Sequence, residues 1–401
     1  MDKEFKSVCV MGLGYIGLPT ASLLGTKGYQ VTGVDVSPSV VETINQGKIH
    51  IVEPDLDLLV KSAVNAGNLK ASLEPCKADM FIIAVPTPFK DGYVPDLSYV
   101  EQATRTIAPF VEKGNLIILE STSPVGTTDL VAEILQEHGH NTAEDVFVAH
   151  CPERVLPGRI LIELVQNDRI VGGINETSTK VASDFYKEFV SGEVLETSAK
   201  TAELSKLTEN SFRDVNIAFA NELSLICDKE HIDVWELISL ANRHPRVNIL
   251  QPGPGVGGHC IAVDPWFIIH RNPEQSKLIR SAREVNDAKP EWVVNKVKEK
   301  AERFKQPVIA CLGLTFKANV DDLRESPALA ITKQLIEENI GEIIVCEPNI
   351  KTHKDFELCS FDEAVDRADI LLLLVDHKPF ESLSAAKLSE KIVIDTRGIV
   401  K

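Results

Sequence analysis

The 401-residue sequence has no hydrophobic run long enough to cross a membrane, and aromatic residues make up only 6% of it. Its longest apolar runs, such as ILLLLV at 370–375, have the length of a β-strand rather than of a membrane span. The first residues, MDKEFKSVCVMGLG, lead into a strand pattern without the long apolar stretch of a signal peptide. We therefore expect a soluble, cytoplasmic protein that binds no membrane.

Cysteine patterns typical of metal sites are also missing. None of the eight cysteines forms a C-x-x-C pair, and no group of His and Cys has the spacing of a zinc site. We expect no metal, and we expect the thiols to be reduced in the cytoplasm. Positive charge is scarce as well, because 42 Lys and Arg face 59 Asp and Glu, for a net charge of −17. This balance argues against nucleic acid as a partner.

The pattern of apolar residues indicates an α/β protein. Strand-like runs alternate with helical stretches such as 98–111 in the first part of the chain, which predicts a parallel sheet covered on both faces. These runs are 8–11, 31–36, 80–85, 116–119 and 146–149. Strand-like runs return near the end of the chain, at 308–312, 343–346, 370–374 and 392–394.

The middle of the chain is helical. Residues 199–227 contain no Gly or Pro and repeat apolar positions at helical spacing, so we predict one long helix that connects domains and forms a homodimer. Shorter helices are expected at 234–241 and 291–304. The predicted fold is thus two Rossmann-like domains, residues 1–197 and 305–401, joined by a central helical domain, residues 198–304. An internal similarity between VCVMGLGY at 8–15 and VIACLGLTF at 308–316 supports a duplicated fold.

A glycine-rich motif follows the first predicted strand. The pattern G-x-G-x-x-G lies between a strand and a helix, which is the context that dinucleotide binding requires. Asp35 ends the second strand, where a carboxylate can bind both ribose hydroxyls and repel a 2′-phosphate, so NAD is favoured over NADP. FAD, or a tight turn without a ligand, is the alternative. The predicted cofactor residues are Gly12, Gly14, Tyr15, Ile16, Gly17 and Asp35.

The stretch GPGVGGHCIAVDPWF at 253–267 places Cys260 after five glycines and prolines. A buried core thiol is the usual role of a lone cysteine, but cores are seldom built from such a loop. His259 and nearby cations could lower the pKa of the thiol. A nucleophilic thiol beside NAD could hold an aldehyde as a thiohemiacetal that gives up a second hydride.

Other candidates lie on the long helix and at the carboxyl edge of the first sheet. Lys206 and Asn210 are four residues apart and share a helix face, although a solvated face is their ordinary fate. Thr122 and Glu153 each follow a predicted strand, where α/β sheets bind ligands, although both could be ordinary loop residues. Basic residues gather in the middle of the acidic chain and suggest a pocket for an anionic substrate. They are Arg154, Arg159, Lys206, Arg213, Arg243, His244, Arg246, Arg280 and Arg283.

The order of several motifs resembles the UDP-glucose/GDP-mannose dehydrogenase family of nucleotide-sugar 6-dehydrogenases, over essentially the whole chain. The motifs are GLGYIGLP, VPTP, ESTSPVGTT, CPERVLPG, AELSKLTENSFRDVNIAFANE, GPGVGGHC and GLTFKANVDDLRESPA. The loop GGHCIAVDPWF and the stretch PERVLPG are most similar to the branch that acts on N-acetylamino sugars. The resemblance implies oxidation of the C6 hydroxyl of UDP-N-acetyl-D-mannosamine to a carboxylate with two NAD. UDP-N-acetylglucosamine and UDP-glucose are the alternative substrates.

The resemblance also implies roles for particular residues. Cys260 would be the nucleophile, and Lys206, with Asn210 beside it, would stabilise the developing oxyanion or shuttle a proton. Asp264 would hold the catalytic water or assist proton transfer, and Glu153 with Thr122 would act on the water for thioester hydrolysis. Thr87, Thr122 and Arg324 would join the cofactor site. The implied UDP-sugar residues are Arg154, Val155, Lys206, Asn210, Arg213, His244, Arg246, Gly257, Phe316, Lys317 and Arg397.

Two other classes of protein remain open at this point. A single-step NAD dehydrogenase of the 6-phosphogluconate or hydroxyisobutyrate kind also joins a Rossmann domain to a helical one, but it needs no nucleophilic cysteine. A regulator that binds NAD or a nucleotide sugar without turnover is the second. The joint presence of Lys206, Cys260 and Asp264 argues against it.

Overall fold

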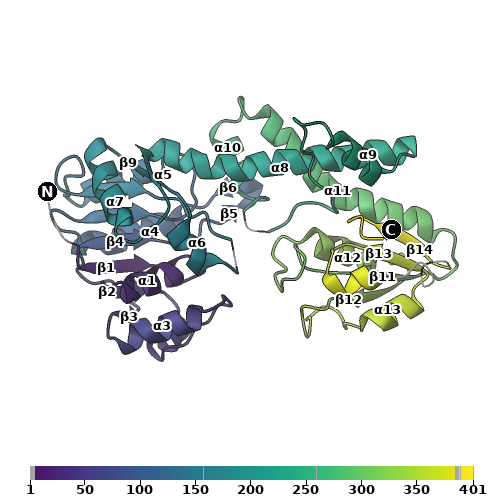
Figure 1. The fold of residues 1–401 in the computed structure, drawn as a ribbon, viewed down its shortest axis with the longest axis horizontal. Coiled ribbons are helices and arrows are strands. Elements are labelled where there is room, and N and C mark those ends of the chain that lie inside the picture. The colour runs from purple at the N-terminus through teal and green to yellow at the C-terminus, as the bar shows by residue number, and fades with distance from the viewer. Residues whose placement is uncertain (1–4, 157, 259, 384–387, 389, 401) are drawn as a thin grey trace. The chain divides into compact units, whose positions relative to one another are not determined.

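The computed structural model describes residues 5–156, 158–258, 260–383, 388 and 390–400. The chain divides into two compact units, Met1–Thr208 and Glu209–Lys401. Each unit is built around a large β-sheet with helices on both of its faces (Figure 1).

An eight-stranded sheet forms the centre of the first unit, in the order β10-β9-β8-β7-β4-β1-β2-β3. Neighbouring strands are parallel except at the β8–β9 pair, so β9 and β10 run against the other strands. The strand order reverses between β1 and β4, because β2 and β3 lie beyond β1 on one side and β7 and β8 lie beyond β4 on the other. This reversal creates the crevice where such sheets bind ligands. The strands are β1 (Ser7–Met11), β2 (Gln30–Val34), β3 (Leu69–Ser72), β4 (Met80–Ile83), β7 (Leu116–Leu119), β8 (Phe147–His150), β9 (Arg169–Gly173) and β10 (Val194–Ser198).

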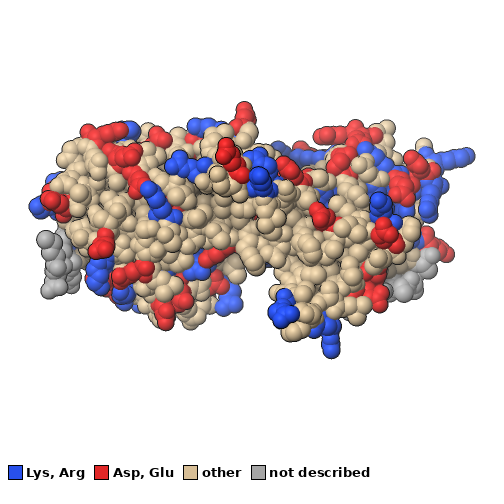
Figure 2. Space-filling view, turned by 90° about the horizontal axis from the view of Figure 1, so that it is seen from above, with Lys and Arg blue, Asp and Glu red and all other residues tan. Residues whose placement is uncertain are grey.

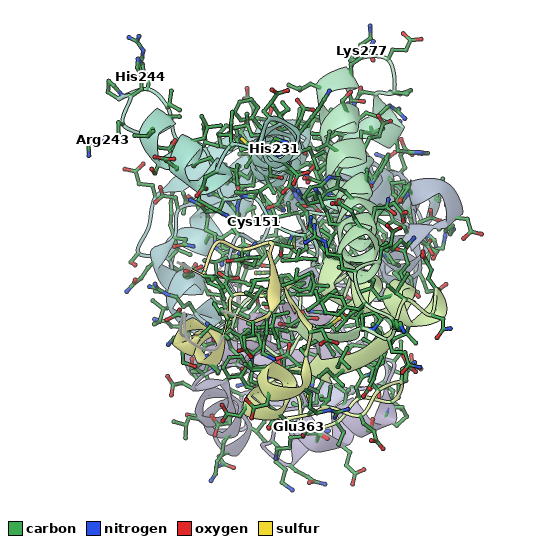
Figure 3. All side chains as sticks on the ribbon, turned by 90° about the vertical axis from the view of Figure 1, so that its right-hand side faces the viewer. Cys151, His231, Arg243, His244, Lys277 and Glu363 are labelled. Carbon is green, nitrogen blue, oxygen red and sulfur yellow. The ribbon has the colours of Figure 1, made fainter. Side chains whose placement is uncertain are left out.

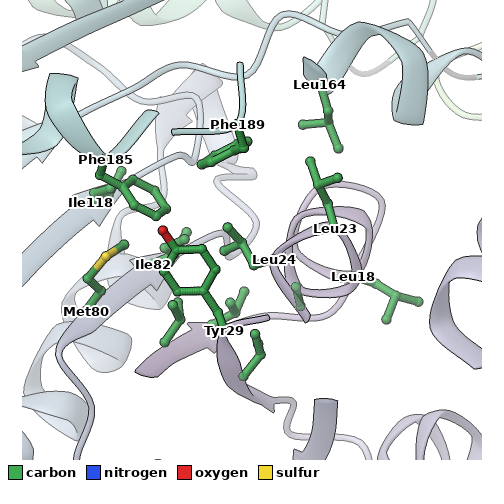
Figure 4. Close-up of a cluster of buried hydrophobic side chains, with 14 of the residues drawn as sticks. Leu18, Leu23, Leu24, Tyr29, Met80, Ile82, Ile118, Leu164, Phe185 and Phe189 are labelled. Carbon is green, nitrogen blue, oxygen red and sulfur yellow. The ribbon is translucent and has the colours of Figure 1, made fainter. Parts of the chain in front are cut away.

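Helices cover both faces of this sheet because its strands are apolar on both sides. Buried residues of α1, α3, α6 and α7 pack on one face, and those of α4 and α5 pack on the other. On the first face Leu24 of α1 packs beside Tyr29 and Ile82, with Phe185 and Phe189 above them (Figure 4). The helices are α1 (Gly17–Thr26), α2 (Pro38–Asn45), α3 (Leu56–Asn65), α4 (Ser98–Ile107), α5 (Thr127–Glu137), α6 (Ile160–Gln166) and α7 (Glu176–Lys187), and a short hairpin joins β5 (Phe89–Lys90) to β6 (Val94–Pro95).

The second unit combines helices with a four-stranded parallel sheet in the order β12-β11-β13-β14. Helices α11 and α12 pack on one face of this sheet and α13 on the other. The long helix α8 (Ala199–Glu230) begins in the first unit and ends in the second. The other elements are α9 (Val234–Ala241), α10 (Asp264–Arg271), α11 (Lys277–Ala301), β11 (Val308–Leu312), α12 (Pro327–Glu337), β12 (Glu342–Cys346), α13 (Phe361–Arg367), β13 (Ile370–Leu373) and β14 (Ile392–Asp395).

The predicted elements are confirmed, but several observed elements, including β5, β6 and α10, were not predicted. Strands β3, β9 and β10 were not predicted, and the first sheet is not wholly parallel because β9 and β10 run in the opposite direction. Helix α11 begins at Lys277 and contains Pro290, whereas the sequence predicts a helix only from residue 291. A proline removes one backbone hydrogen bond, but the buried side chains of Val293, Val294 and Val297 hold this helix against the second sheet.

The surface carries charged side chains of both signs, as expected from the 42 Lys and Arg and 59 Asp and Glu of the chain. Acidic and basic side chains are interspersed over the face shown in Figure 2. Within the described residues, no helix combines the length and the apolar character that crossing a membrane requires.

Candidate active site

The loop between β1 and α1 fits a bound dinucleotide. Gly12 adopts a φ of 91°, and a Cβ there would lie 2.6 Å from the carbonyl oxygen of Ala84. A Cβ on Gly17 would lie 1.8 Å from the carbonyl oxygen of Gly12. At Gly14, in contrast, no atom of the described residues other than Gly14 and its chain neighbours lies within 4 Å of the Cβ position. Two glycines are therefore required by the close packing of the protein, and the third leaves room for a pyrophosphate.

The surroundings of this loop supply the remaining features of a dinucleotide site. The amino end of α1 has no side-chain cap at Ile16, so its backbone N–H groups and dipole are suited to a phosphate. Asp35 follows β2 and accepts hydrogen bonds from the backbone N–H groups of Leu13, at 3.1 Å, and Ser37, at 2.9 Å. These bonds fix the carboxylate beside the glycine loop, and Tyr15 is exposed at its rim.

Two more predicted residues meet at the carboxyl edge of the sheet. Thr87 follows β4 and Thr122 follows β7, and these two strands are neighbours. The Thr87 hydroxyl donates a hydrogen bond of 2.5 Å to the carbonyl oxygen of Thr122. The Ser121 hydroxyl donates to the carbonyl oxygen of Val85 at 2.7 Å, which ties the same two loops together.

Glu153 lies at this edge as predicted, but its carboxylate is buried. Its Oε2 accepts a hydrogen bond of 2.9 Å from Nη1 of Arg169, and both side chains are almost fully buried. Its Oε1 accepts from the backbone N–H of Arg154 at 2.6 Å. The guanidinium therefore holds Glu153 in one orientation. The sequence offered no signal for Arg169, because this residue comes from β9, which was not predicted.

A second carboxyl group lies beside this ion pair. Glu120 ends β7 and accepts hydrogen bonds from the hydroxyl of Tyr186, at 2.8 Å, and from that of Thr20, at 3.4 Å. Burial, followed by the nearby charge of Glu153, raises the pKa of Glu120 to about 7. Glu120 precedes Ser121 and Thr122 in the EST stretch, but its burial could not be read from the sequence.

In the second unit the structure brings Cys260, Asp264 and Asn210 together. The Cys260 side chain is exposed, in the turn that leads into α10. The backbone N–H of Asp264 donates to the carbonyl oxygen of Cys260 at 2.8 Å, which fixes the two residues one turn apart. The buried carboxylate of Asp264 accepts a hydrogen bond of 2.5 Å from Nδ2 of Asn210 on α8. His259, which was expected to influence the thiol, lies outside the described residues.

Lys206 belongs to the same long helix as Asn210. The two residues are four apart on α8, so their side chains leave the helix on one face, as predicted. Asn210 is buried and Lys206 is half-buried. The pair therefore does not lie on a fully solvated helix face.

The glycine-rich loop that precedes Cys260 packs against the protein. A Cβ on Gly257 would lie 2.3 Å from the carbonyl oxygen of Glu325, and one on Gly258 would lie 2.8 Å from the ring of Phe316. The backbone N–H of Gly258 donates to the carbonyl oxygen of Arg324 at 3.2 Å. The glycines therefore let the loop approach its neighbours closely. This packing role of the glycines could not be read from the sequence.

A cavity of about 210 Å³ in the second unit lies beside this loop. Three predicted UDP-sugar residues, Phe316, Lys317 and Arg397, line it together. Arg397 is held by a hydrogen bond of 2.9 Å from its Nε to Asp376. An aromatic ring and two cations at the carboxyl edge of a nucleotide fold suit a nucleoside diphosphate. The other lining residues are Pro254, Gly255, Thr315, Ala318, Pro327, Ala328, Leu374, Val375 and Asp376.

Most of the remaining predicted residues lie on the surface or beside it. Arg283, which was predicted to belong to a basic pocket, is instead buried and pairs with Asp214 at 2.6 Å. Arg213, His244 and Arg246 are exposed, and Figure 3 shows His244 and Arg243 pointing outward beyond the end of α9. Arg324 pairs with Asp322, with 2.6 Å between its Nη2 and Oδ2. Arg154 is half-buried and donates to the carbonyl oxygen of Asp168 at 3.2 Å, and Val155 packs against the core of the first unit.

The fold and the glycine loop of the first unit are those of NAD-dependent dehydrogenases. Residues 6–190 match the NAD binding domain of the UDP-glucose/GDP-mannose dehydrogenase family, residues 200–288 match its central domain, and residues 310–401 match its UDP binding domain. The chain therefore belongs to this family. The predictions of the family, the NAD cofactor and the dehydrogenase class are confirmed.

Individual relatives are similar over almost their whole length. An NDP-N-acetyl-D-galactosaminuronic acid dehydrogenase from Ralstonia nicotianae is 56% identical, over 100% of this chain and 97% of that protein. A UDP-N-acetyl-D-mannosamine dehydrogenase from Campylobacter jejuni is also 56% identical, over 96% of this chain and 98% of that protein. The solved structure of a UDP-N-acetyl-mannosamine dehydrogenase from S. aureus superposes with a TM-score of 0.91 at 44% identity, covering 99% of this chain and 96% of that one.

Proposed function

We propose that the protein oxidises the C6 hydroxyl of UDP-N-acetyl-D-mannosamine to the carboxylate. The observation that carries this proposal is the identity of 56% over nearly the whole chain to an enzyme of that name, together with the grouping of Cys260, Asp264 and Asn210. NAD would supply the hydride acceptor for each of the two oxidations. Gly12, Gly14, Gly17 and Asp35 would hold it.

Cys260 accounts for the second oxidation. Loss of a hydride from C6 and of a proton from its hydroxyl leaves an aldehyde. The Cys260 sulfur then bonds to C6 and gives a thiohemiacetal. Loss of a second hydride and a proton converts this adduct to a thioester. Water adds to the thioester carbon, the C–S bond breaks, and the carboxylate and the free thiol are released.

The neighbours of Cys260 supply proton transfer and charge stabilisation. Asp264, fixed by Asn210, is suited to hold the hydrolytic water or to assist proton transfer. Lys206 and Asn210 would stabilise the oxyanion that develops at the C6 oxygen. Glu153 and Thr122 are proposed to act on the hydrolytic water, with the Arg169 guanidinium holding the Glu153 carboxyl group in one orientation. Arg324 is proposed to extend the cofactor site, together with Thr87 and Thr122.

Binding of the UDP-sugar is divided among several surfaces in this proposal. Phe316, Lys317 and Arg397 would hold the uridine diphosphate, and their shared cavity supports this assignment. Arg154, Val155 and Gly257, together with Arg213, His244 and Arg246, are proposed to contact the remainder of the substrate.

The assembly and location of the protein are also proposals. We propose a homodimer through α8, because Phe212, Phe219 and Ile226 recur every seven residues on this helix and are 68%, 54% and 49% exposed. We also propose domain limits at 1–197, 198–304 and 305–401, and the family matches over residues 6–190, 200–288 and 310–401 support three domains in this order. The cytoplasm, where the eight free thiols would stay reduced, is the proposed location.

A second candidate substrate is the N-acetyl-D-galactosamine analogue. The Ralstonia relative, an NDP-N-acetyl-D-galactosaminuronic acid dehydrogenase, matches this chain at the same 56% identity. The two sugars differ only in stereochemistry, at C2 and C4 of the ring, and both carry the C6 hydroxyl that Cys260 requires.

The deciding experiment measures NADH formation with a panel of UDP-sugars. The panel contains UDP-N-acetyl-D-mannosamine, UDP-N-acetyl-D-galactosamine, UDP-N-acetylglucosamine and UDP-glucose. We expect the highest kcat/KM for UDP-N-acetyl-D-mannosamine, with two NADH formed per sugar consumed. A higher value for another sugar would overturn the substrate assignment, and one NADH per sugar would indicate a single-step dehydrogenase. Binding without any NADH would indicate a regulator.

A further inference from the structure

A buried histidine lies beneath the cavity of the second unit. His377 follows β13 and is fully buried. Its Nδ1 lies 2.9 Å from the backbone N of Asn319, and its Nε2 lies 3.0 Å from Oε2 of Glu347. Neither His377 nor Glu347 lines the cavity.

The hydrogen-bond partners determine which ring nitrogen of His377 carries the proton. The backbone N–H of Asn319 can only donate, so Nδ1 must accept and cannot itself be protonated. The Nε2–H therefore donates to Glu347. Asn349 supports the same arrangement, because its Nδ2 lies 2.9 Å from Nδ1. Both ring nitrogens of His377 are thus engaged, Nδ1 as an acceptor and Nε2 as a donor.

Glu347 occupies the position in the second fold that Asp35 occupies in the first. Each follows the second strand of its nucleotide fold and accepts a hydrogen bond from the loop after the first strand. Oε2 of Glu347 accepts from the backbone N–H groups of Leu314, at 2.7 Å, and Thr315, at 3.2 Å. Burial acts to raise the pKa of Glu347, but hydrogen bonds from His377, Leu314 and Asn349 together hold it below its usual value. Glu347 is 3% exposed, and its carboxylate oxygens accept hydrogen bonds from within its own fold.

The segment 314–319 is held at both ends by these two side chains. Glu347 binds its start at Leu314 and Thr315, and His377 binds its end at Asn319. Within the segment the Thr315 hydroxyl donates to the carbonyl oxygen of Lys317 at 2.9 Å. Asn319 has a positive φ of 59°, a backbone conformation that needs such support.

We infer that His377 is a positioning residue of the nucleotide cavity, because with Glu347 it fixes the segment that carries Phe316 and Lys317 into the cavity wall. The histidine acts through the loop and not by contact with the ligand. The inference rests on the proposed function, in which this cavity binds uridine diphosphate. It adds a buried determinant of substrate affinity to the residues that line the cavity.

The test measures binding of UDP to the full-length chain by calorimetry, together with steady-state kinetics. We expect His377→Leu to raise the Kd for UDP and the KM for the UDP-sugar by about tenfold. The kcat and the KM for NAD should change less than about twofold, because the hydrogen bonds described for His377 go to Asn319, Glu347 and Asn349 of the second nucleotide fold. His377→Asn should recover part of the affinity, since its Oδ1 can accept the hydrogen bond from the Asn319 N–H.

The matched control is Leu335→Ala. Leu335 is a fully buried core residue of the same unit, on α12, and it does not line the cavity. Its loss should lower the melting temperature without changing the Kd for UDP. If His377→Leu and Leu335→Ala weaken UDP binding equally at matched losses of stability, the effect is general destabilisation and the inference is wrong.

Two further results complete the test. Should His377→Leu fail to fold, His377→Asn and Glu347→Gln decide the question. Glu347→Gln is expected to raise the Kd for UDP, and unchanged affinity in both variants would overturn the inference. Absence of UDP binding in the wild-type chain would instead refute the proposed use of the cavity.

Discussion

Cys260 and Asp264 illustrate how much chemistry one turn of backbone can position. The hydrogen bond from the Asp264 N–H to the Cys260 carbonyl oxygen fixes their spacing, and Asn210 fixes the carboxylate. The thiol is exposed while the carboxylate is buried, so a substrate can reach the sulfur without displacing its neighbour.

The first prediction follows from the need for a thiol between the two oxidations. Cys260→Ala should lower the rate of carboxylate formation on the order of 10³-fold or more, because the aldehyde can no longer be held as a covalent adduct. UDP affinity should be unchanged. The measurement is NADH and carboxylate formed per sugar. Cys359→Ala, which changes a half-buried thiol of the same unit, is the control and should retain full turnover. Full turnover by Cys260→Ala would refute the mechanism.

A second prediction at this scale concerns Glu120. Its pKa of about 7 in the folded protein exceeds the ordinary value of 4.5, so the folded state holds a proton that the unfolded chain has released. The contribution of Glu120 to wild-type stability therefore falls as the pH rises from about 4.5 to about 7, by roughly 3 kcal/mol. Glu120→Gln keeps an oxygen for the Tyr186 hydroxyl and removes this loss.

Urea unfolding of both proteins at several pH values provides the measurement. The stability advantage of Glu120→Gln should be near zero at pH 4.5 and should reach its maximum above pH 7. Glu133→Gln, which changes an exposed glutamate of α5, should show no such pH dependence. An advantage that is the same at all pH values would contradict the prediction.

Individual residues differ in how far the sequence could identify them. Cys260 and Asp264 lie within one short stretch, and the glycine loop is continuous in sequence. The spacing of residues within each motif was therefore enough to identify them as site residues. Arg169 and Tyr186 reach Glu153 and Glu120 only because β7, β8 and β9 are neighbours in the sheet. Such pairs depend on strand order, which local pattern does not contain.

At the scale of elements, continuous apolar runs predicted the central strands well because these strands are buried on both faces. Strands β3 and β10 lie at the edges of the first sheet. β3 alternates exposed with covered residues and β10 has no fully buried residue, which weakens their signal. The antiparallel direction of β9 could not be predicted, because strand direction follows from the path of the connecting chain.

Helix α8 leads to the third prediction. Its residues Phe212, Phe219 and Ile226 form an exposed apolar stripe with a seven-residue repeat, the spacing that keeps side chains on one helix face. Phe212→Glu combined with Phe219→Glu should produce monomers in light scattering, because two carboxylates would be buried unpaired in the interface. Lys229→Glu, an exposed change on the same helix, should leave the dimer intact. A wild-type monomer, or a dimer that tolerates the double change, would contradict the proposal.

At the scale of the whole molecule, the chain contains two nucleotide folds, and the acidic residue that follows the second strand has a different environment in each. Asp35 of the first fold is half-buried beside a glycine loop with open space at Gly14. Glu347 of the second is buried, and its fold offers a cavity lined by an aromatic ring and cations. The internal sequence similarity predicted the duplication, but this divergence became visible only from the side-chain contacts.

The fourth prediction is that the two folds bind their ligands separately. Asp35→Ala should raise the KM for NAD by about tenfold or more, because it removes a carboxylate suited to the ribose hydroxyls, and it should leave the Kd for UDP unchanged. Arg397→Met should do the reverse, because Arg397 lines the cavity of the second fold and contributes one of its cations. Calorimetry with UDP and initial rates with NAD measure both effects, and each variant serves as the control for the other. If either variant weakened both ligands to the same extent, the assignment of one nucleotide to each fold would be wrong.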